Sequence, residues 1–185
     1  MLDILLYGDD DQADAAVQRL KQMGVAEKQE ILEDLSSRLL HQENNPDQRW
    51  WIARALAEIP GEKARCLLRF TLSDNDPGVR QCAALGLRKE PQLSDMAVLS
   101  AAISDPDPLC ADLAADALIL IGEPAVPGLL ESFRQGDLLT RQRALRALAL
   151  IGQPEARTLF EAAAGDASDV VRYWAQTGLE TLGRP

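Results

Sequence analysis

The sequence repeats itself with a period near thirty residues, and this repeat limits the fold more than any other feature. Similar segments begin at Asn45, Asp76, Asp107, Asp137 and Ser168, so successive copies lie 31, 31, 30 and 31 residues apart. Each copy holds two helical stretches, and a unit this short cannot bury its apolar face alone. Stacked copies can share one continuous core, so the repeat predicts a helical solenoid.

Each copy begins with the residue types that start a helix. Asn, Asp and Ser side chains accept a hydrogen bond from a free amide of the first helical turn, and three of the starts are followed by proline, which suits that turn. Eleven residues after each start the chain has leucine, directly preceded by Ala or Gly. These leucines are Leu56, Leu87, Leu118, Leu148 and Leu179. We therefore predict that the second helix of every copy begins at the repeat start and buries this leucine.

The repeated series of a cap, Val-Arg, alanine, Ala-Leu and a final Gly or Pro, clearest over 76–91, resembles the short HEAT-like repeats. Repeats of this type also occur in phycobilisome lyases. The resemblance implies an all-α fold, a right-handed α–α superhelix of about six helical pairs. It implies a single domain over 1–185, with an irregular N-terminal cap over 1–44 and regular repeats over 45–183. A resemblance of this kind implies a fold more strongly than a function.

Apolar residues at helical spacing, and the Gly and Pro residues between them, divide the chain into helices. One helix each is expected within 1–7, 9–24 and 26–41. The later predicted helices are 46–59, 62–73, 77–89, 94–104, 108–121, 124–135, 138–151, 154–164 and 169–182.

In HEAT-like repeats, a loop acid and a helix arginine typically bond between neighbouring repeats. By this resemblance, structural roles are expected for Arg49, Arg80, Arg141, Arg172, Asp74, Asp105 and Asp166. Ala111 and Gln135 stand where the series would require Arg and an acid. The planar guanidinium can bond a carboxylate through two hydrogen bonds and so fix the angle between units. We favour this structural interpretation of the series over a catalytic one.

The composition disfavours several classes of partner. The formal net charge is −10 and the pI is near 4.6, which argues against nucleic acid and anionic membranes because both need a positive face. Residues 1–7 are apolar but too few for a signal peptide core or a membrane span. The three cysteines have no metal-ligand spacing, so we expect free thiols in a reducing, cytoplasmic setting.

No arrangement of residues indicates catalysis. The chain has one histidine, His41, whereas a metal-dependent enzyme would need clustered His and acidic ligands. Neither a Gly-rich phosphate loop nor a nucleophile elbow is present in the sequence. Cys82 and Cys110 fall on packed sides of their helices and are interpreted as small apolar residues. We therefore predict no catalytic residues, no metal and no cofactor.

One side of the second helices has the composition of a binding surface. In HEAT-like solenoids these helices generally line the concave face, and the side opposite the predicted core mixes aromatic, aliphatic and arginine residues. Such residues dominate protein interfaces, whereas a face that meets only water is mostly charged. The predicted protein-binding residues are Trp50, Arg54, Leu85, Arg88, Ile119, Leu145, Arg146 and Tyr173. Packing of Trp50 and Tyr173 against neighbouring helices remains an equal alternative.

Charge is also unevenly distributed in the fourth copy. Its arginines could seat an acidic segment of a partner, although a solvated charge run is the preferred interpretation. They are Arg134, Arg141, Arg143, Arg146 and Arg157.

The sequence thus predicts a non-enzymatic scaffold that binds another protein along a concave face. The family resemblance alone raises an alternative, a bilin lyase or tetrapyrrole-chaperone subunit, in which Arg54, Arg88 and Arg146 could hold propionate groups. A second alternative is a self-associating structural module, and the chain is expected to be a monomer or a weak homo-oligomer.

Overall fold

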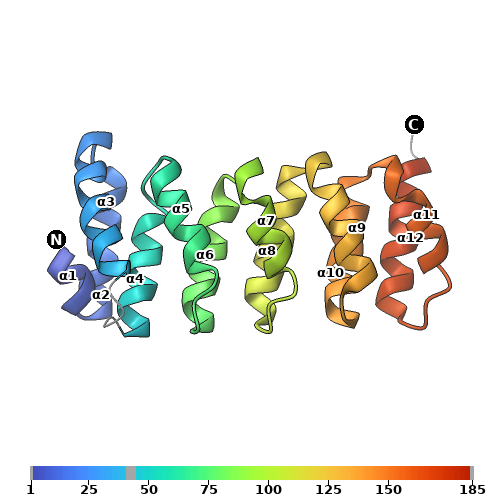
Figure 1. The fold of residues 1–185 in the computed structure, drawn as a ribbon, viewed down its shortest axis with the longest axis horizontal. Coiled ribbons are helices and arrows are strands. Elements are labelled where there is room, and N and C mark those ends of the chain that lie inside the picture. Colours follow the sequence, from blue (N-terminus) through green and yellow to red (C-terminus); the bar gives the residue numbers. More distant parts are fainter. Residues whose placement is uncertain (1, 41–44, 184–185) are drawn as a thin grey trace. The chain divides into compact units, whose positions relative to one another are not determined.

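The computed structural model describes residues 2–40 and 45–183, and within these residues it contains helices and no strand (Figure 1). His41 lies outside the described residues. The chain divides into two compact units, Met1–Glu90 and Pro91–Pro185. Within the described ranges, no helix has the length and apolar character that crossing a membrane requires.

Unit 1 holds the helices of the N-terminal cap and of the first regular repeats. They are α1 (Leu2–Tyr7), α2 (Asp10–Gln22), α3 (Val25–Leu40), α4 (Pro46–Leu56), α5 (Glu62–Thr71) and α6 (Pro77–Lys89). The second helices α4 and α6 pack against each other, and α5 packs against both. Helix α1 packs on α2 and α4, and α2 also contacts α4, so the irregular N-terminal segment covers the first regular repeat.

Unit 2 repeats the same pairing. Its helices are α7 (Met96–Ala102), α8 (Pro108–Ile121), α9 (Val126–Gln135), α10 (Leu138–Ile151), α11 (Arg157–Ala163) and α12 (Asp169–Gly183). The first helices α7, α9 and α11 each follow a single 3-10 turn, at Leu93–Asp95, Glu123–Ala125 and Pro154–Ala156. The second helices pack in order, α8 against α10 and α10 against α12.

The predicted helix starts are confirmed by their hydrogen bonds. Each capping side chain accepts an amide three residues further on, which satisfies one donor of the first turn. The bonds join Asn45 to Gln48 at 2.8 Å, Asp76 to Val79 at 3.1 Å, Asp107 to Cys110 at 2.8 Å, Asp137 to Thr140 at 2.8 Å and Ser168 to Val171 at 3.4 Å. The Gln48 side chain accepts the Asn45 amide in return, which completes a capping box.

The predicted core leucines confirm the repeat. Leu56, Leu87, Leu118 and Leu148 have no exposed surface. Leu179 is half-buried on α12, the last described helix. The predicted all-α fold of paired helices is therefore confirmed, while the single-domain organisation stays a prediction.

The glycines before Leu87 and Leu179 are explained by close helix contacts. A Cβ on Gly86 would lie 2.9 Å from the Ala57 Cβ and 3.2 Å from the Leu68 Cδ1. A Cβ on Gly178 would lie 2.5 to 2.7 Å from ring carbons of Phe160. These separations are shorter than packed carbon atoms allow, so both positions require glycine unless the neighbour moves.

Candidate functional site

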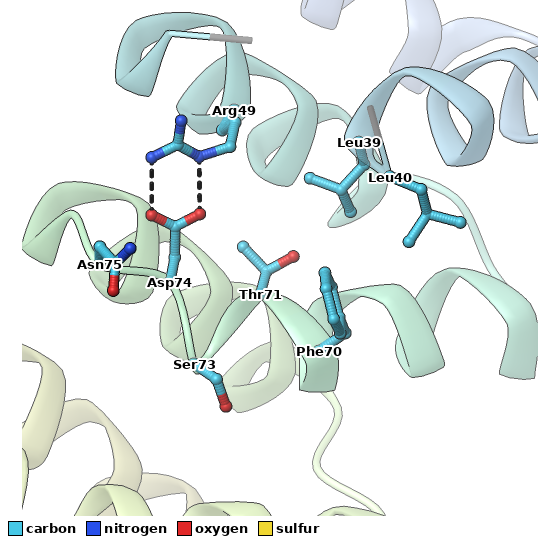
Figure 2. A pocket seen from close by; sticks show the side chains of 8 residues that line it. All are labelled: Leu39, Leu40, Arg49, Phe70, Thr71, Ser73, Asp74 and Asn75. Carbon is cyan, nitrogen blue, oxygen red and sulfur yellow. Dashed lines mark hydrogen bonds and ion pairs between the residues drawn. The ribbon is translucent and has the colours of Figure 1, made fainter. Parts of the chain in front are cut away.

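The loop before α6 ties neighbouring repeats together in unit 1. The guanidinium of Arg49 on α4 donates two hydrogen bonds to the Asp74 carboxylate, at 2.7 Å and 2.9 Å (Figure 2). Asp74 also accepts the Asp76 amide at 2.9 Å, and Arg80 donates to the backbone carbonyls of Asp74 and Asn75. Arg49 therefore bonds the carboxylate of the loop residue Asp74, and Arg80, on the next second helix, bonds the backbone of the same loop.

The same arrangement recurs in unit 2 around the loop before α12. Arg141 on α10 bonds the Asp166 carboxylate at 2.5 Å. Asp166 accepts the Ser168 amide at 2.9 Å, and Arg172 donates to the Asp166 carbonyl at 2.7 Å. The recurrence favours the structural role expected for these residues over a catalytic one.

The copy that begins at Asp107, in which Ala111 replaces the helix arginine, keeps only part of this arrangement. Asp105 accepts the Asp107 amide at 2.8 Å, as Asp74 and Asp166 do in their loops. Ala111 occupies the place of the helix arginine and is buried on α8. The loop turn therefore depends on the acid and does not need an arginine on its own helix.

These paired carboxylates make stability depend on pH. Burial alone would raise the pKa of Asp74, but hydrogen bonds from Arg49 and from the Asp76 amide outweigh it and lower the pKa. The Ser168 amide, and then Arg141, lower the pKa of Asp166. In the acidic range the unfolded chain therefore binds more protons than the folded chain. The free energy of unfolding rises with pH in this range and levels off above about pH 5.

We expect this stabilisation to be lost as the pH falls through the lowered pKa values of Asp74 and Asp166, below the usual aspartate pKa of 3.8. Urea unfolding at a series of acidic pH values measures the slope. The Asp74→Asn, Asp166→Asn variant keeps an acceptor for each loop amide but cannot titrate, so its slope should be shallower. An unchanged slope would show that other carboxylates carry the dependence.

A hollow beside Arg49, here called the Phe70 hollow, lies between α3, α4 and α5 (Figure 2). It has a volume of about 530 Å³. Its lining consists of Leu39, Leu40, Arg49, Phe70, Thr71, Ser73, Asp74 and Asn75. Because the charges of Arg49 and Asp74 satisfy each other, the hollow offers mainly the exposed side chains of Leu40 and Phe70 for contact.

The residues predicted for protein binding differ in exposure. Tyr173 is 62% exposed and Leu85 is 41% exposed. Trp50, Arg54, Arg88, Ile119 and Arg146 are half-buried. Leu145 has no exposed surface, so its prediction as a contact residue is wrong. The binding role of the other residues stays a prediction.

The error at Leu145 has a structural cause. Eight residues after the repeat start, Ala53, Ala84, Ala115 and Leu145 all have no exposed surface. Since neighbouring second helices pack side by side within each unit, one flank of α4, α6, α8 and α10 is covered as well as the side that faces the first helices. A helical wheel with a single buried side cannot show this second contact.

Exposed apolar residues at the start of the second helices in unit 2 were not predicted from the sequence. Leu109, Leu139 and Val170 stand two residues after their repeat starts and are 52%, 54% and 46% exposed. The repeat alignment contains the signal, because an apolar residue directly inside a capped helix start has no partner in the second-helix core. Together with Tyr173, they form what we call the unit 2 edge.

Two arginines of the predicted face, and Arg143 of the fourth copy, are already paired with acids of the chain. Arg54 bonds Asp14 of α2 at 3.0 Å. Arg143 bonds Asp112 of α8 at 2.7 Å, and Arg146 bonds Asp116. Arg141, Arg143 and Arg146 of the fourth copy are thus each paired with an acid of the chain, which leaves less free positive charge to seat an acidic segment of a partner.

A second hollow, here called the Trp50 hollow, lies where the N-terminal ends of α2, α4 and α6 meet in unit 1. Its volume is about 520 Å³. It is lined by Asp10, Asp11, Asp14, Pro46, Asp47, Trp50, Trp51, Asp76 and Gly78. The two indole rings meet edge to face with centroids 4.7 Å apart, and both are half-buried. Of these residues, only Trp50 was predicted from the sequence to bind a partner.

Two further observations concern reactive groups. Burial raises the pKa of the Cys82 thiol to about 12, so this thiol is protonated at neutral pH. Among residues 2–40 and 45–183, no group of three or more His, Cys, Asp or Glu side chains is placed to hold a metal ion.

Comparison with known sequences identifies part of the repeat. Residues 96–180 match the family of HEAT repeats. A segment of 86 residues is 41% identical to the phycocyanobilin lyase subunit beta of Pseudanabaena tenuis (strain PCC 7409). That segment is 46% of this chain and 30% of the relative, so the chain spans under a third of the length of that protein.

Comparison with solved structures shows the fold of the whole chain. A crystal structure of an engineered protein has a TM-score of 0.56 at 19% identity and covers 98% of this chain and 94% of its own. A designed armadillo repeat protein in complex with the peptide (KR)4 has a TM-score of 0.55 at 17% identity and covers 98% of each chain. The chain thus has the fold of armadillo-type and HEAT-type helical repeats.

Proposed function

Because residues 96–180 belong to the HEAT repeat family and the chain has a helical-repeat fold, we propose that this protein is a non-enzymatic scaffold that binds another protein. Its contact surface is the exposed face of the second helices, the face expected to be concave. A designed repeat protein of the same fold binds a peptide, which supports this class of function. Rigid stacked helices offer a preformed surface and so reduce the entropy lost on binding.

The observation that carries the proposal is the exposure of large apolar side chains on the second helices. The unit 2 edge exposes about half of each of its residues, and Leu85 is exposed on α6 in unit 1. Exposing large apolar side chains to water costs about 25 cal/mol per Å². Apolar residues that recur on one face are therefore best explained by a partner that covers them.

Affinity capture with two matched variants tests the proposal. Leu139→Ser with Tyr173→Ser removes an aliphatic and an aromatic contact from the unit 2 edge. Leu93→Ser with Phe70→Ser removes a similar pair of exposed side chains from outside the second helices. We expect the first variant to lose a protein that wild type and the second variant both capture, measured by mass spectrometry.

Other outcomes of the capture experiment would contradict the proposal. Loss in the second variant alone would move the contact to the first helices or to the Phe70 hollow. Recovery of this chain alone, with a molar mass that rises with concentration in sedimentation equilibrium, would replace the scaffold with a self-associating module.

A bilin lyase or tetrapyrrole-chaperone subunit is the second candidate, favoured by the 41% identity to a phycocyanobilin lyase subunit. In this interpretation Arg54, Arg88 and Arg146 would hold propionate groups. Arg54 and Arg146 already bond Asp14 and Asp116, so a pigment would have to displace these acids. A saturable shift of phycocyanobilin absorbance at one pigment per chain would support this candidate, and an unchanged spectrum would favour the scaffold.

The cysteines support the proposal that the protein works in a reducing, cytoplasmic setting. Cys66, Cys82 and Cys110 are free thiols, and Cys82 and Cys110 are buried as small apolar residues. Exposed free thiols such as Cys66 persist where the surroundings keep them reduced.

A further inference from the structure

The Trp50 hollow has the chemistry of a cation-binding site. Asp10, Asp11 and Asp47 are exposed on its rim, and no Lys or Arg of the described chain pairs with them. The indole ring of Trp50 is half-buried, so part of it remains open to a ligand. The face of an indole ring attracts cations through its quadrupole, and nearby carboxylates add to this attraction.

Helix dipoles explain only part of the acidic charge. Acids are favoured at helix N-termini, and Asp76 caps α6 through the Val79 amide. The N-terminal end of a helix is equivalent to about half a positive elementary charge, so the ends of α2, α4 and α6 together supply about 1.5 positive charges. Five carboxylates line the hollow, and Arg54 neutralises one of them, Asp14. A negative excess therefore remains.

The protein's own Arg54 demonstrates how a cation binds beside this hollow. Its guanidinium carbon lies 5.8 Å from the centroid of the Trp50 ring, and the group bonds Asp14 at 3.0 Å. This bond lowers the pKa of Asp14. One guanidinium is thus already held between an indole ring and a carboxylate, and the hollow lies beside the same ring and the same acid.

We propose that the Trp50 hollow binds an Arg or Lys side chain from a basic segment of the partner protein. The inference rests on the proposed scaffold function and specifies the chemistry of the partner. The guanidinium or ammonium group contacts the open part of the Trp50 ring and pairs with Asp11 and Asp47 on the rim. A volume of about 520 Å³ accommodates a long side chain, and the net charge of −10 attracts a basic segment from a distance.

Calorimetric titration with two synthetic peptides tests the charge requirement. The first is an uncharged Gly-Ser peptide that contains three arginines, and the second has citrulline, a neutral analogue of arginine, at the same places. We expect the arginine peptide to bind about tenfold more tightly than the citrulline peptide at moderate salt. Equal affinity, or no binding of either peptide, would overturn the proposal.

Matched charge variants separate a specific site from general attraction. Asp11→Asn with Asp47→Asn removes two charges from the hollow, whereas Glu155→Gln with Glu161→Gln removes two exposed charges from unit 2. We expect affinity for the arginine peptide to fall about tenfold in the first variant and to stay within about twofold of wild type in the second. An equal loss in both variants would show attraction by net charge and would contradict a site.

Substitution of the aromatic ring tests the indole contact. Trp50→Phe keeps a ring in place but weakens its attraction for a cation, so we expect a smaller loss than in Trp50→Ala. Circular dichroism shows whether each variant remains folded. Equal affinity of wild type and both variants would remove Trp50 from the site. Failure of the peptide experiments leaves the capture experiment on the unit 2 edge unaffected, so the two proposals can fail separately.

Discussion

Replacing Phe160 with alanine is expected to lower the free energy of unfolding by about 3–5 kcal/mol. The Phe160 side chain on α11 has no exposed surface and faces Gly178 on α12. Removing the ring leaves a cavity between the two helices of the last described pair, and this cavity adds to the lost burial. Urea unfolding followed by far-UV circular dichroism measures the change.

Gly178→Ala provides a sharper test of the same contact. In wild type the added methyl group would lie 2.5 to 2.7 Å from the Phe160 ring, so we expect a loss of about 1–3 kcal/mol from overpacking. In the Phe160→Ala background the ring carbons nearest to the added methyl group are gone, and the higher helix propensity of alanine should contribute about 1 kcal/mol in its favour. The effect of one substitution should therefore change sign.

A double-mutant cycle evaluates this coupling. If Gly178→Ala has the same effect in both backgrounds, the two residues are not in contact and the explanation of the tight position is wrong. The matched control is Gly165→Ala in the loop after α11, where an added Cβ meets nothing within 4 Å. Its effect should not depend on Phe160.

The helix starts and the core could be predicted from the sequence because they depend on local rules that recur in every copy. A cap such as Asp137 needs only a free amide three residues later, and a core position such as Leu148 needs only helical spacing from its cap. Repetition separates these signals from chance, since five copies agree on the same spacing.

The exposed face was predicted less well because it depends on contacts between repeats. Leu145 was expected at the surface, yet the packing of α10 with its neighbouring second helices buries it. Leu139 was not selected, although it is 54% exposed. Helical spacing defines the sides of one helix, whereas a neighbouring helix decides which of those sides remain open.

The Trp50 hollow could not be predicted from the sequence for a different reason. Its lining comes from three helices, and Asp11 and Trp50 lie far apart in the sequence. The irregular N-terminal segment brings α2 beside α4, so the spacing of the regular repeats does not apply there. A site of this kind becomes visible only when the side chains are placed in space.

Leu118→Ala tests the repeat itself, because Leu118 occupies the strongest core position of α8. The side chain has no exposed surface, and its truncation should lower the free energy of unfolding by about 2–5 kcal/mol. Leu120 lies on the same helix, two residues further along, and is 61% exposed. The same substitution at Leu120 should change the free energy by less than about 0.5 kcal/mol.

The comparison of the two leucines removes helix propensity from the interpretation, since both variants replace leucine with alanine within α8. Any difference between the two variants in the loss of unfolding free energy then reflects the burial of the leucine side chain. Equal effects would mean that α8 is rotated from the position that the repeat assigns to it, and the leucines at the same place in the other copies would lose their assignment as well. A large difference would instead support the repeat assignment. Each core leucine stands eleven residues after its helix cap, so this spacing would determine which side of the second helix is buried.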